Sequence, residues 1–137
     1  MNLFKSFIPF AFVLLLQVQL RAQVVINEIQ SVNESTIKDF QDEYPDWIEL
    51  YNSGNSDVNL TGFGLSDKAD NPFLWIFPNI TITAGQYLIV FASSKDTVVG
   101  SELHTNFKLS SAGEEIYLTN KNGLLVDFIS VVSLKEN

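Results

Sequence analysis

The amino-acid sequence predicts an all-β domain of about eight or nine short strands that form a β-sandwich or a barrel. Short apolar runs rich in Val, Ile, Tyr, Phe, Trp and Thr recur about every ten residues, and turn residues separate them. No stretch keeps the i, i+3, i+4, i+7 spacing of an amphipathic helix for long enough to predict one. Many short strands without helices between them are typical of two packed sheets.

The expected strands alternate with turns along the chain. In chain order, these strands lie at residues 24–30, 47–52, 58–60, 63–66, 73–77, 80–83, 87–92, 115–119 and 124–129. Asn122 and Gly123 provide the positive-φ pair of a tight hairpin between the last two strands. Two longer segments, 31–46 and 93–105, are expected to be loops, and the first has room for one helical turn near 36–40.

Residues 1–22 have the composition of a secretory signal peptide. Lys5 precedes ten largely apolar residues at 7–16, and the small residue Ala22 follows a polar step. Ten residues are too few to cross a bilayer, which takes a helix of roughly 20. We therefore expect cleavage after Ala22, a secreted or cell-surface protein with no membrane insertion after cleavage, and one β-sandwich domain over residues 23–137.

Charge and cysteine content exclude several classes of function. The 137 residues include 8 Lys+Arg and 16 Asp+Glu, and loss of residues 1–22 would leave 6 basic against 16 acidic residues, a charge of −10. Such an excess repels phosphate backbones and anionic membrane surfaces, so we expect no nucleic-acid partner. Without Cys the chain has no disulfide, no zinc–thiolate site and no thiol nucleophile.

Alternation assigns faces to the strand expected at 47–52. Ile48 and Leu50 share one face, which we expect to be buried, while Trp47, Glu49 and Tyr51 share the other. If solvent reaches the second face, these three residues form a candidate patch for contact with a protein or a sugar. If the other sheet or the loop 31–46 covers that face, the aromatic residues are simply core, and this is the interpretation we favour.

Two further strands carry apolar side chains whose burial can be predicted. The strand expected at 87–92 is apolar on both faces, which predicts a central strand covered on both sides. Trp75 and Phe77 alternate with Leu74 and Ile76, and we assign both aromatic residues to the core.

Candidate catalytic residues are few. His104 is the only histidine, and no G-x-S-x-G motif is present. It lies in a polar segment, so we expect it to be exposed to solvent or to lie in a turn. Glu28 and Glu49 fall within predicted strands and would suit a glycosidase-like carboxylate pair only at the right separation. We expect no catalytic residue. A small secreted hydrolase that uses carboxylates or His104 is the alternative.

Carboxylates on loops are candidate Ca²⁺ ligands, because Ca²⁺ prefers hard oxygen donors. The first long loop contains Asp39 and the candidates Asp42, Glu43 and Asp46, and a later loop contains Asp67 and Asp70. Neither loop has the EF-hand pattern, and solvated acidic loops explain the same residues. We therefore expect no cofactor, and a Ca²⁺-stabilised adhesion domain stays open as an alternative.

Seven segments carry a shared pattern of packing and turn residues. They lie at residues 26–29, 46–52, 58–67, 75–78, 82–92, 113–118 and 123–127. Read in this order, the segments resemble the lamin-tail domain family over about residues 24–129. The resemblance implies an immunoglobulin-like β-sandwich and transfers no catalytic residue.

The resemblance also implies a function. Members of this family in exported bacterial proteins are regarded as non-catalytic modules that accompany hydrolase or nuclease domains and mediate attachment. We therefore expect an exported, non-catalytic module that contacts a protein or a cell-surface component. The chain would be either a stand-alone module or the N-terminal piece of a larger secreted protein.

Overall fold

The computed structural model describes residues 23–132, so the predicted signal peptide at 1–22 lies outside the described residues. Within the described range the chain forms eleven strands and no helix, and accordingly no helix there is long and apolar enough to cross a membrane. The strands are β1 Val24–Gln30, β2 Asp46–Asn52, β3 Val58–Asn59, β4 Gly64–Ser66, β5 Trp75–Ile76, β6 Thr81–Ile82, β7 Tyr87–Ala92, β8 Thr97–Val99, β9 Glu102–His104, β10 Gly113–Thr119 and β11 Leu125–Val132. The all-β prediction is confirmed.

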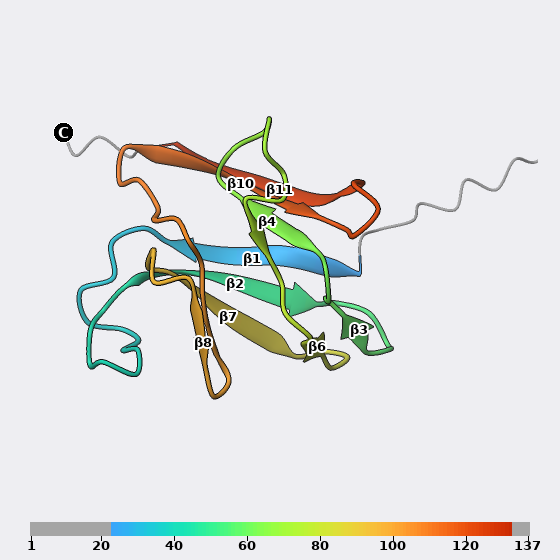
Figure 1. Ribbon diagram of the computed structural model, residues 1–137, viewed down its shortest axis with the longest axis horizontal. Coiled ribbons are helices and arrows are strands. Elements are labelled where there is room, and N and C mark those ends of the chain that lie inside the picture. Colours follow the sequence, from blue (N-terminus) through green and yellow to red (C-terminus); the bar gives the residue numbers. More distant parts are fainter. Residues whose placement is uncertain (1–22, 133–137) are drawn as a thin grey trace, which may run out of the picture.

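The strands form a β-sandwich. One sheet has five strands in the order β1-β2-β7-β9-β8, and its neighbours are antiparallel except for the parallel pair β7–β9. The second sheet has four strands in the order β11-β10-β4-β5, and β3 pairs with β6 as a small third sheet. Figure 1 shows β10 and β11 in one layer, with β1, β2 and β7 in the layer below them.

The core lies between the two main sheets and follows the predicted alternation. Ile48 and Leu50 of β2 are fully buried, as are Ile116 and Leu118 of β10 on the facing sheet. Each such side chain contributes roughly 1.5–3 kcal/mol to folding when it is removed from water. Trp75 and Phe77 belong to the same buried set, which confirms their assignment to the core.

Strands β8 and β9 were not predicted, because they lie inside the segment 93–105 that was expected to be a loop. Each has only three residues, and two of the three side chains of β8, Val98 and Val99, are exposed. Strand β9 pairs in parallel with β7, so the paired residues, such as Val90 and Leu103, are separated by a crossover in the chain. A short sequence window carries no signal for such pairing. These two strands extend the five-stranded sheet beyond β7.

The segment 36–40, which had room for a helical turn, does not form one. Asp39 begins a tight turn in which the N–H of Asp42 donates to the carbonyl of Asp39, and Asp42 has a positive φ of 61°. The Asp39 carboxylate also accepts the N–H groups of Gln41 and Glu43. Aspartate offers the backbone these local partners in place of helical hydrogen bonds, which favours a turn over a helix.

The prediction that β7 is a central strand covered on both sides holds for its second half. Val90 is buried in the core, and Phe91 is buried on the opposite face of the sheet. Tyr87, at the start of β7, is 56% exposed on that opposite face. The outer face of the five-stranded sheet is therefore covered at one end and open at the other.

Gly64 provides a test of how the second sheet packs. A Cβ atom at this residue would lie 2.2 Å from the carbonyl oxygen of Pro72 and 2.9 Å from Cδ1 of Phe73. We expect Gly64→Ala to lower the free energy of unfolding by about 1–3 kcal/mol in urea denaturation, because the backbone at Pro72 must move. The control is Ile76→Ala, which changes the exposed cross-strand partner of Gly64 and should stay within about 0.5 kcal/mol. Equal stabilities of the two variants would contradict this packing.

Candidate functional site

The outer face of the five-stranded sheet holds the residues of the predicted interaction patch. The register of β1, β2 and β7 aligns their outward side chains in three rows across the sheet. The rows are Val25–Tyr51–Tyr87, Glu28–Glu49–Ile89 and Gln30–Trp47–Phe91. The patch residues Tyr51, Glu49 and Trp47 thus lie in successive rows along β2, and their surroundings differ.

Residues 31–45, which connect β1 to β2, form a cap over the third row. Trp47 is only 6% exposed and Phe91 only 4%, although both point away from the main core. The ring of His104 stacks on Phe91 with centroids 5.1 Å apart, and the cap residue Phe40 meets His104 edge-on at 5.4 Å. Trp47 therefore lies in a second, smaller buried cluster beneath the cap.

An ion pair attaches the cap to the sheet. The Nζ atom of Lys95 contacts the buried carboxylate of Asp39 and lies 2.7 Å from Oε2 of Glu43. Burial alone would raise the pKa of Asp39, but the hydrogen bonds from Lys95 and from two backbone N–H groups hold that pKa below its usual value. Burial would likewise lower the pKa of Lys95, and its two carboxylate partners raise it instead. The ammonium group thus occupies the space between two carboxylates.

A second link joins the cap to the sheet through His104. Nδ1 of this residue lies 2.9 Å from Oγ of Ser93, and Nε2 lies 3.4 Å from Oε2 of Glu102. The same Glu102 oxygen accepts the backbone N–H of Phe40 at 2.9 Å. The expectation that His104 is exposed is wrong, because the cap and the alternation of β9 bury it completely.

The chain of contacts from Ser93 through His104 to Glu102 is similar to that of a nucleophilic triad. The surroundings of these three residues favour a structural role. Neither ring nitrogen of His104 is open to a substrate, because the residue is fully buried beneath the cap. Ser93 is 8% exposed, and its Oγ accepts the N–H of Lys95 at 3.2 Å. Ser93 also lines a hollow of about 360 Å³ beside Lys95, but its Oγ is already engaged by His104 and by the N–H of Lys95, so in this arrangement the three residues hold the cap.

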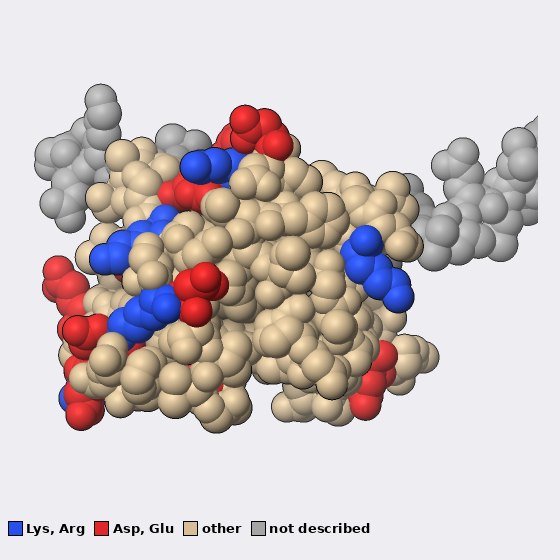
Figure 2. Space-filling view, viewed as in Figure 1, with Lys and Arg blue, Asp and Glu red and all other residues tan. Residues whose placement is uncertain are grey.

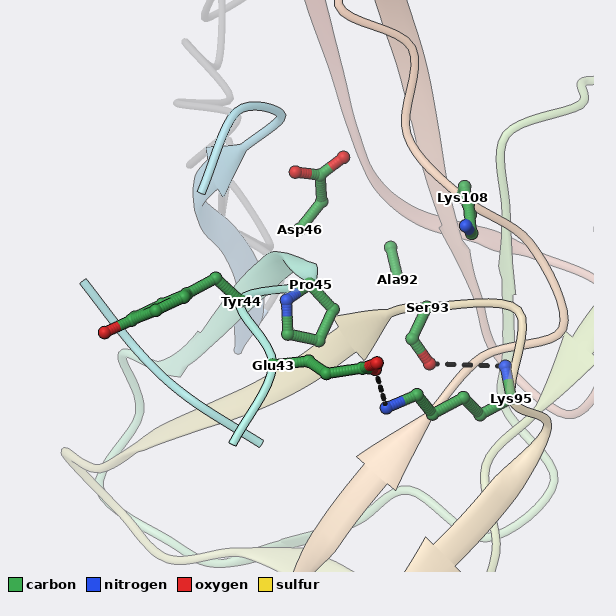
Figure 3. Close-up of a pocket in the computed structure, with 8 residues that line it drawn as sticks. All are labelled: Glu43, Tyr44, Pro45, Asp46, Ala92, Ser93, Lys95 and Lys108. Carbon is green, nitrogen blue, oxygen red and sulfur yellow. Dashed lines mark hydrogen bonds and ion pairs between the residues drawn. The ribbon is translucent and has the colours of Figure 1, made fainter. Parts of the chain in front are cut away.

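The candidate Ca²⁺ ligands do not converge. Glu43 and Asp46 line a hollow of about 360 Å³ beside Lys95 and Lys108, and Figure 3 shows the side chain of Glu43 directed toward Lys95. Burial raises the pKa of Asp46, while the N–H of Asn33 and the charge of Lys108 act in the opposite direction. Figure 2 shows acidic and lysine side chains gathered together at the end of the molecule where the cap lies.

The remaining Ca²⁺ candidates lie elsewhere. Asp42 is exposed on the cap, where it pairs with Lys38 at 3.4 Å, and Asp70 is exposed on another loop. Asp67 lies near Glu114, whose pKa is raised by burial and further by the charge of Asp67. Between residues 23 and 132, no three His, Cys, Asp or Glu side chains are close enough together to hold a metal ion.

The first two rows of the outer face are open, and we call their six residues the open face. The rings of Tyr51 and Tyr87 stack with centroids 4.6 Å apart and planes inclined by 24°. In the next row Glu28 and Glu49 lie directly opposite each other, and Nδ2 of Asn27 donates to Glu49 at 2.7 Å. The residues of the open face are Val25, Glu28, Glu49, Tyr51, Tyr87 and Ile89.

A hollow of about 320 Å³ separates the open face from the cap. Its lining combines apolar residues with one lysine and one glutamate, namely Ile37, Lys38, Tyr87, Leu88, Ile89, Phe91, Ser101 and Glu102. Sequence reasoning named Glu49 and Tyr51 but missed Val25, Tyr87 and Ile89. Only the pairing of β2 with β1 and β7 brings these residues together, and the register of that pairing is not evident from local sequence.

The attachment of the cap predicts a pH-dependent effect of Asp39→Asn. At pH 7 we expect this variant to lose about 1.5–3 kcal/mol of unfolding free energy, because a buried charged hydrogen bond is removed. The folded-state pKa of Asp39 lies below its ordinary 3.8, so the contribution of its charge is present above pH 3.8 and is lost as the pH falls through the folded-state value. The difference from wild type in denaturant titrations should shrink accordingly at acidic pH. The control is Asp42→Asn, an exposed change in the same cap at a positive φ that Asn tolerates, and an equal loss in both variants would contradict the attachment.

The comparison with protein families supports the fold described above. The family model of the Lamin Tail Domain matches residues 17–133, which is most of the chain and includes both main sheets. No curated protein matches the chain. The family consists of non-catalytic immunoglobulin-like domains, and the β-sandwich agrees with that fold. The chain therefore belongs to the lamin tail domain family.

Proposed function

We propose that this chain is an exported, non-catalytic interaction module whose open face contacts a protein or a cell-surface component. The observation that carries the proposal is the stacked pair Tyr51–Tyr87, which lies on an uncovered sheet surface with Tyr87 56% exposed. Large aromatic side chains dominate the energetics of protein interfaces, and tyrosine combines a broad apolar ring with a polar hydroxyl. Family membership supports the coarser statement that the domain is an interaction module.

The open face is a pre-organised surface. Tyr51 lies in β2, which is paired on both sides, and its ring is held against Tyr87 by the stack. A partner that binds there would not have to order a loop, so less conformational entropy is lost on association. This property distinguishes the open face from the exposed side chains of the cap.

Export rests on the sequence of residues 1–22. A charged start, a short apolar stretch and Ala22 are typical of a cleaved signal peptide, and such cleavage would place the domain outside the cytoplasm or on the cell surface. The module acts there either alone or as the N-terminal piece of a larger secreted protein. We propose no enzymatic activity and no cofactor.

The hydrolase alternative has weaker support. Glu28 and Glu49 are cross-strand neighbours on the adjacent strands β1 and β2, not residues on opposite walls of a cleft that could enclose a glycosidic bond. His104, the remaining candidate, is fully buried beneath the cap.

A retention assay tests the proposed function. The chain is expressed with its own residues 1–22, the exported protein is expected to begin at Gln23, and its retention on the producing cells is measured. We expect Tyr51→Ala combined with Tyr87→Ala to reduce retention about tenfold or more. Truncation of an aromatic residue at the centre of an interface lowers the binding free energy by about 1–2 kcal/mol or more. The control combines Ile76→Ala and Phe128→Ala, two exposed apolar residues of the other sheet, with melting curves recorded for all variants. Equal retention of both double variants would contradict the proposal.

Calcium is a separate test. A site with a Kd of about 1 mM would add about 1 kcal/mol at 5 mM Ca²⁺ and would raise the Tm by several degrees. We expect the Tm to change by less than about 1 °C between 5 mM Ca²⁺ and EDTA, because Lys95 already pairs with Asp39 and Glu43. A rise of several degrees that Asp46→Asn or Asp67→Asn abolishes would establish the Ca²⁺-stabilised adhesion domain instead.

A further inference from the structure

We infer that the partner of the open face is an extended polypeptide segment with Lys or Arg side chains. This inference rests on the proposed function and specifies the chemistry of the occupant. It is carried by the charges, the exposed aromatic pair and the spacing of the open face.

The two carboxylates of the open face favour a cationic ligand. Glu28 and Glu49 are direct cross-strand neighbours, and like charges in such a pair destabilise a sheet. Among residues 23–132 neither glutamate forms an ion pair, and Glu49 has only the neutral amide of Asn27 as a partner. A cationic group of a partner would relieve the repulsion between the two carboxylates. A neutral partner would bury both carboxylates without compensating their charge, and an acidic partner would increase the repulsion.

The aromatic pair adds a second kind of contact for the same ligand. Tyr51 lies two residues from Glu49 on the same face of β2, which places the two rows about 7 Å apart. The exposed ring of Tyr87, stacked on Tyr51, can take a Lys or Arg side chain over its face, since aromatic rings attract cations within about 6 Å. The open face thus offers a carboxylate pair and an aromatic pair side by side.

The spacing of the two rows favours an extended segment. Alternate side chains of an extended peptide point to the same side and are also about 7 Å apart. A peptide that runs along β2 can therefore place one basic side chain between Glu28 and Glu49 and the next one over the tyrosines. This match requires neither a folded partner nor a change in the sheet.

The hollow between the open face and the cap fits the end of such a segment. Ile37, Ile89 and Phe91 give it an apolar lining. Glu102 also lines it, but its Oε2 accepts the backbone N–H of Phe40. The one cation that lines it, Lys38, is paired with Asp42 at 3.4 Å. The two glutamates of the open face thus supply the negative charge for the proposed ligand, and the cation beside the hollow already has an acidic partner on the cap.

A peptide titration of the exported domain tests the inference. The probes are a capped peptide in which Lys alternates with Thr or Val, a matched peptide with Gln in place of each Lys, and a neutral β-linked oligosaccharide. Backbone amide shifts are recorded by NMR, and affinities are measured at low and high salt. We expect the Lys peptide to shift the amides of the open face selectively and to bind more weakly at high salt, because surface charges are then screened.

Matched variants separate this site from general attraction to an acidic protein. Glu28→Gln combined with Glu49→Gln should raise the Kd of the Lys peptide about fivefold or more, and Tyr87→Ala should raise it about threefold. Glu34→Gln combined with Asp70→Asn removes the same charge from exposed loops and should change the Kd less than about twofold. Equal effects of the two double variants, or shifts centred on the cap, would overturn the inference.

Failure of this inference can be distinguished from failure of the proposed function. If the oligosaccharide or the Gln peptide shifts the open face as strongly as the Lys peptide, the basic partner is wrong and the open face is still an interaction site. If the Lys peptide does not bind the open face while retention on cells still depends on Tyr51 and Tyr87, the inference fails alone. If retention is also unaffected by the tyrosines, both fail.

Discussion

The position of β2 between β1 and β7 is the constraint on which the rest of the structure depends. The strand alternates strictly, so Ile48 and Leu50 point into the core while Trp47, Glu49 and Tyr51 point outward. A shift of one residue in either ladder would exchange these faces and place Glu49 in the core. Burial of the two aliphatic residues therefore fixes the outward positions of Trp47, Glu49 and Tyr51, and a β-bulge between Ile26 and Glu28 brings Glu28 opposite Glu49.

The cap decides how much of the outer face is available. The connection from β1 to β2 is long and polar, and a segment that packs on a sheet must satisfy its own backbone groups. Asn33 donates to the carbonyls of Ile37 and Pro45, and Asp39 accepts two N–H groups within the cap. With these groups satisfied locally, the cap packs on His104 through Phe40, His104 stacks in turn on Phe91, and Lys95 holds the cap through Asp39. It leaves Tyr51 and Tyr87 outside.

The sequence predicts the architecture better than it predicts the site. The period-two pattern in β2, the continuous apolar run in β7 and the turn at Asn122 and Gly123 are local signals, and the corresponding strands and hairpin are present. The burial of His104 could not be predicted, because it results from Phe40, which lies far away in the chain, and from a parallel pairing with β7. Lys95 could not be assigned to Asp39 for the same reason. The open face is a product of strand register, so the sequence suggested Glu49 and Tyr51 but not their neighbours.

The aromatic residues of the outer face indicate that its open half is a property of the domain and not the result of an incomplete cap. Under the cap lie Trp47 and Phe91, and the indole N–H of Trp47 is buried without a hydrogen-bond partner. The uncovered rows instead contain two tyrosines and two glutamates, whose polar ends are well solvated in water and would be costly to bury beneath a loop of the same chain. Glu28 and Glu49 would repel any further acidic covering segment. The polar ends of the tyrosines and glutamates therefore match the solvated environment of the open half, whereas the unpaired indole N–H of Trp47 is a cost of covering the other half.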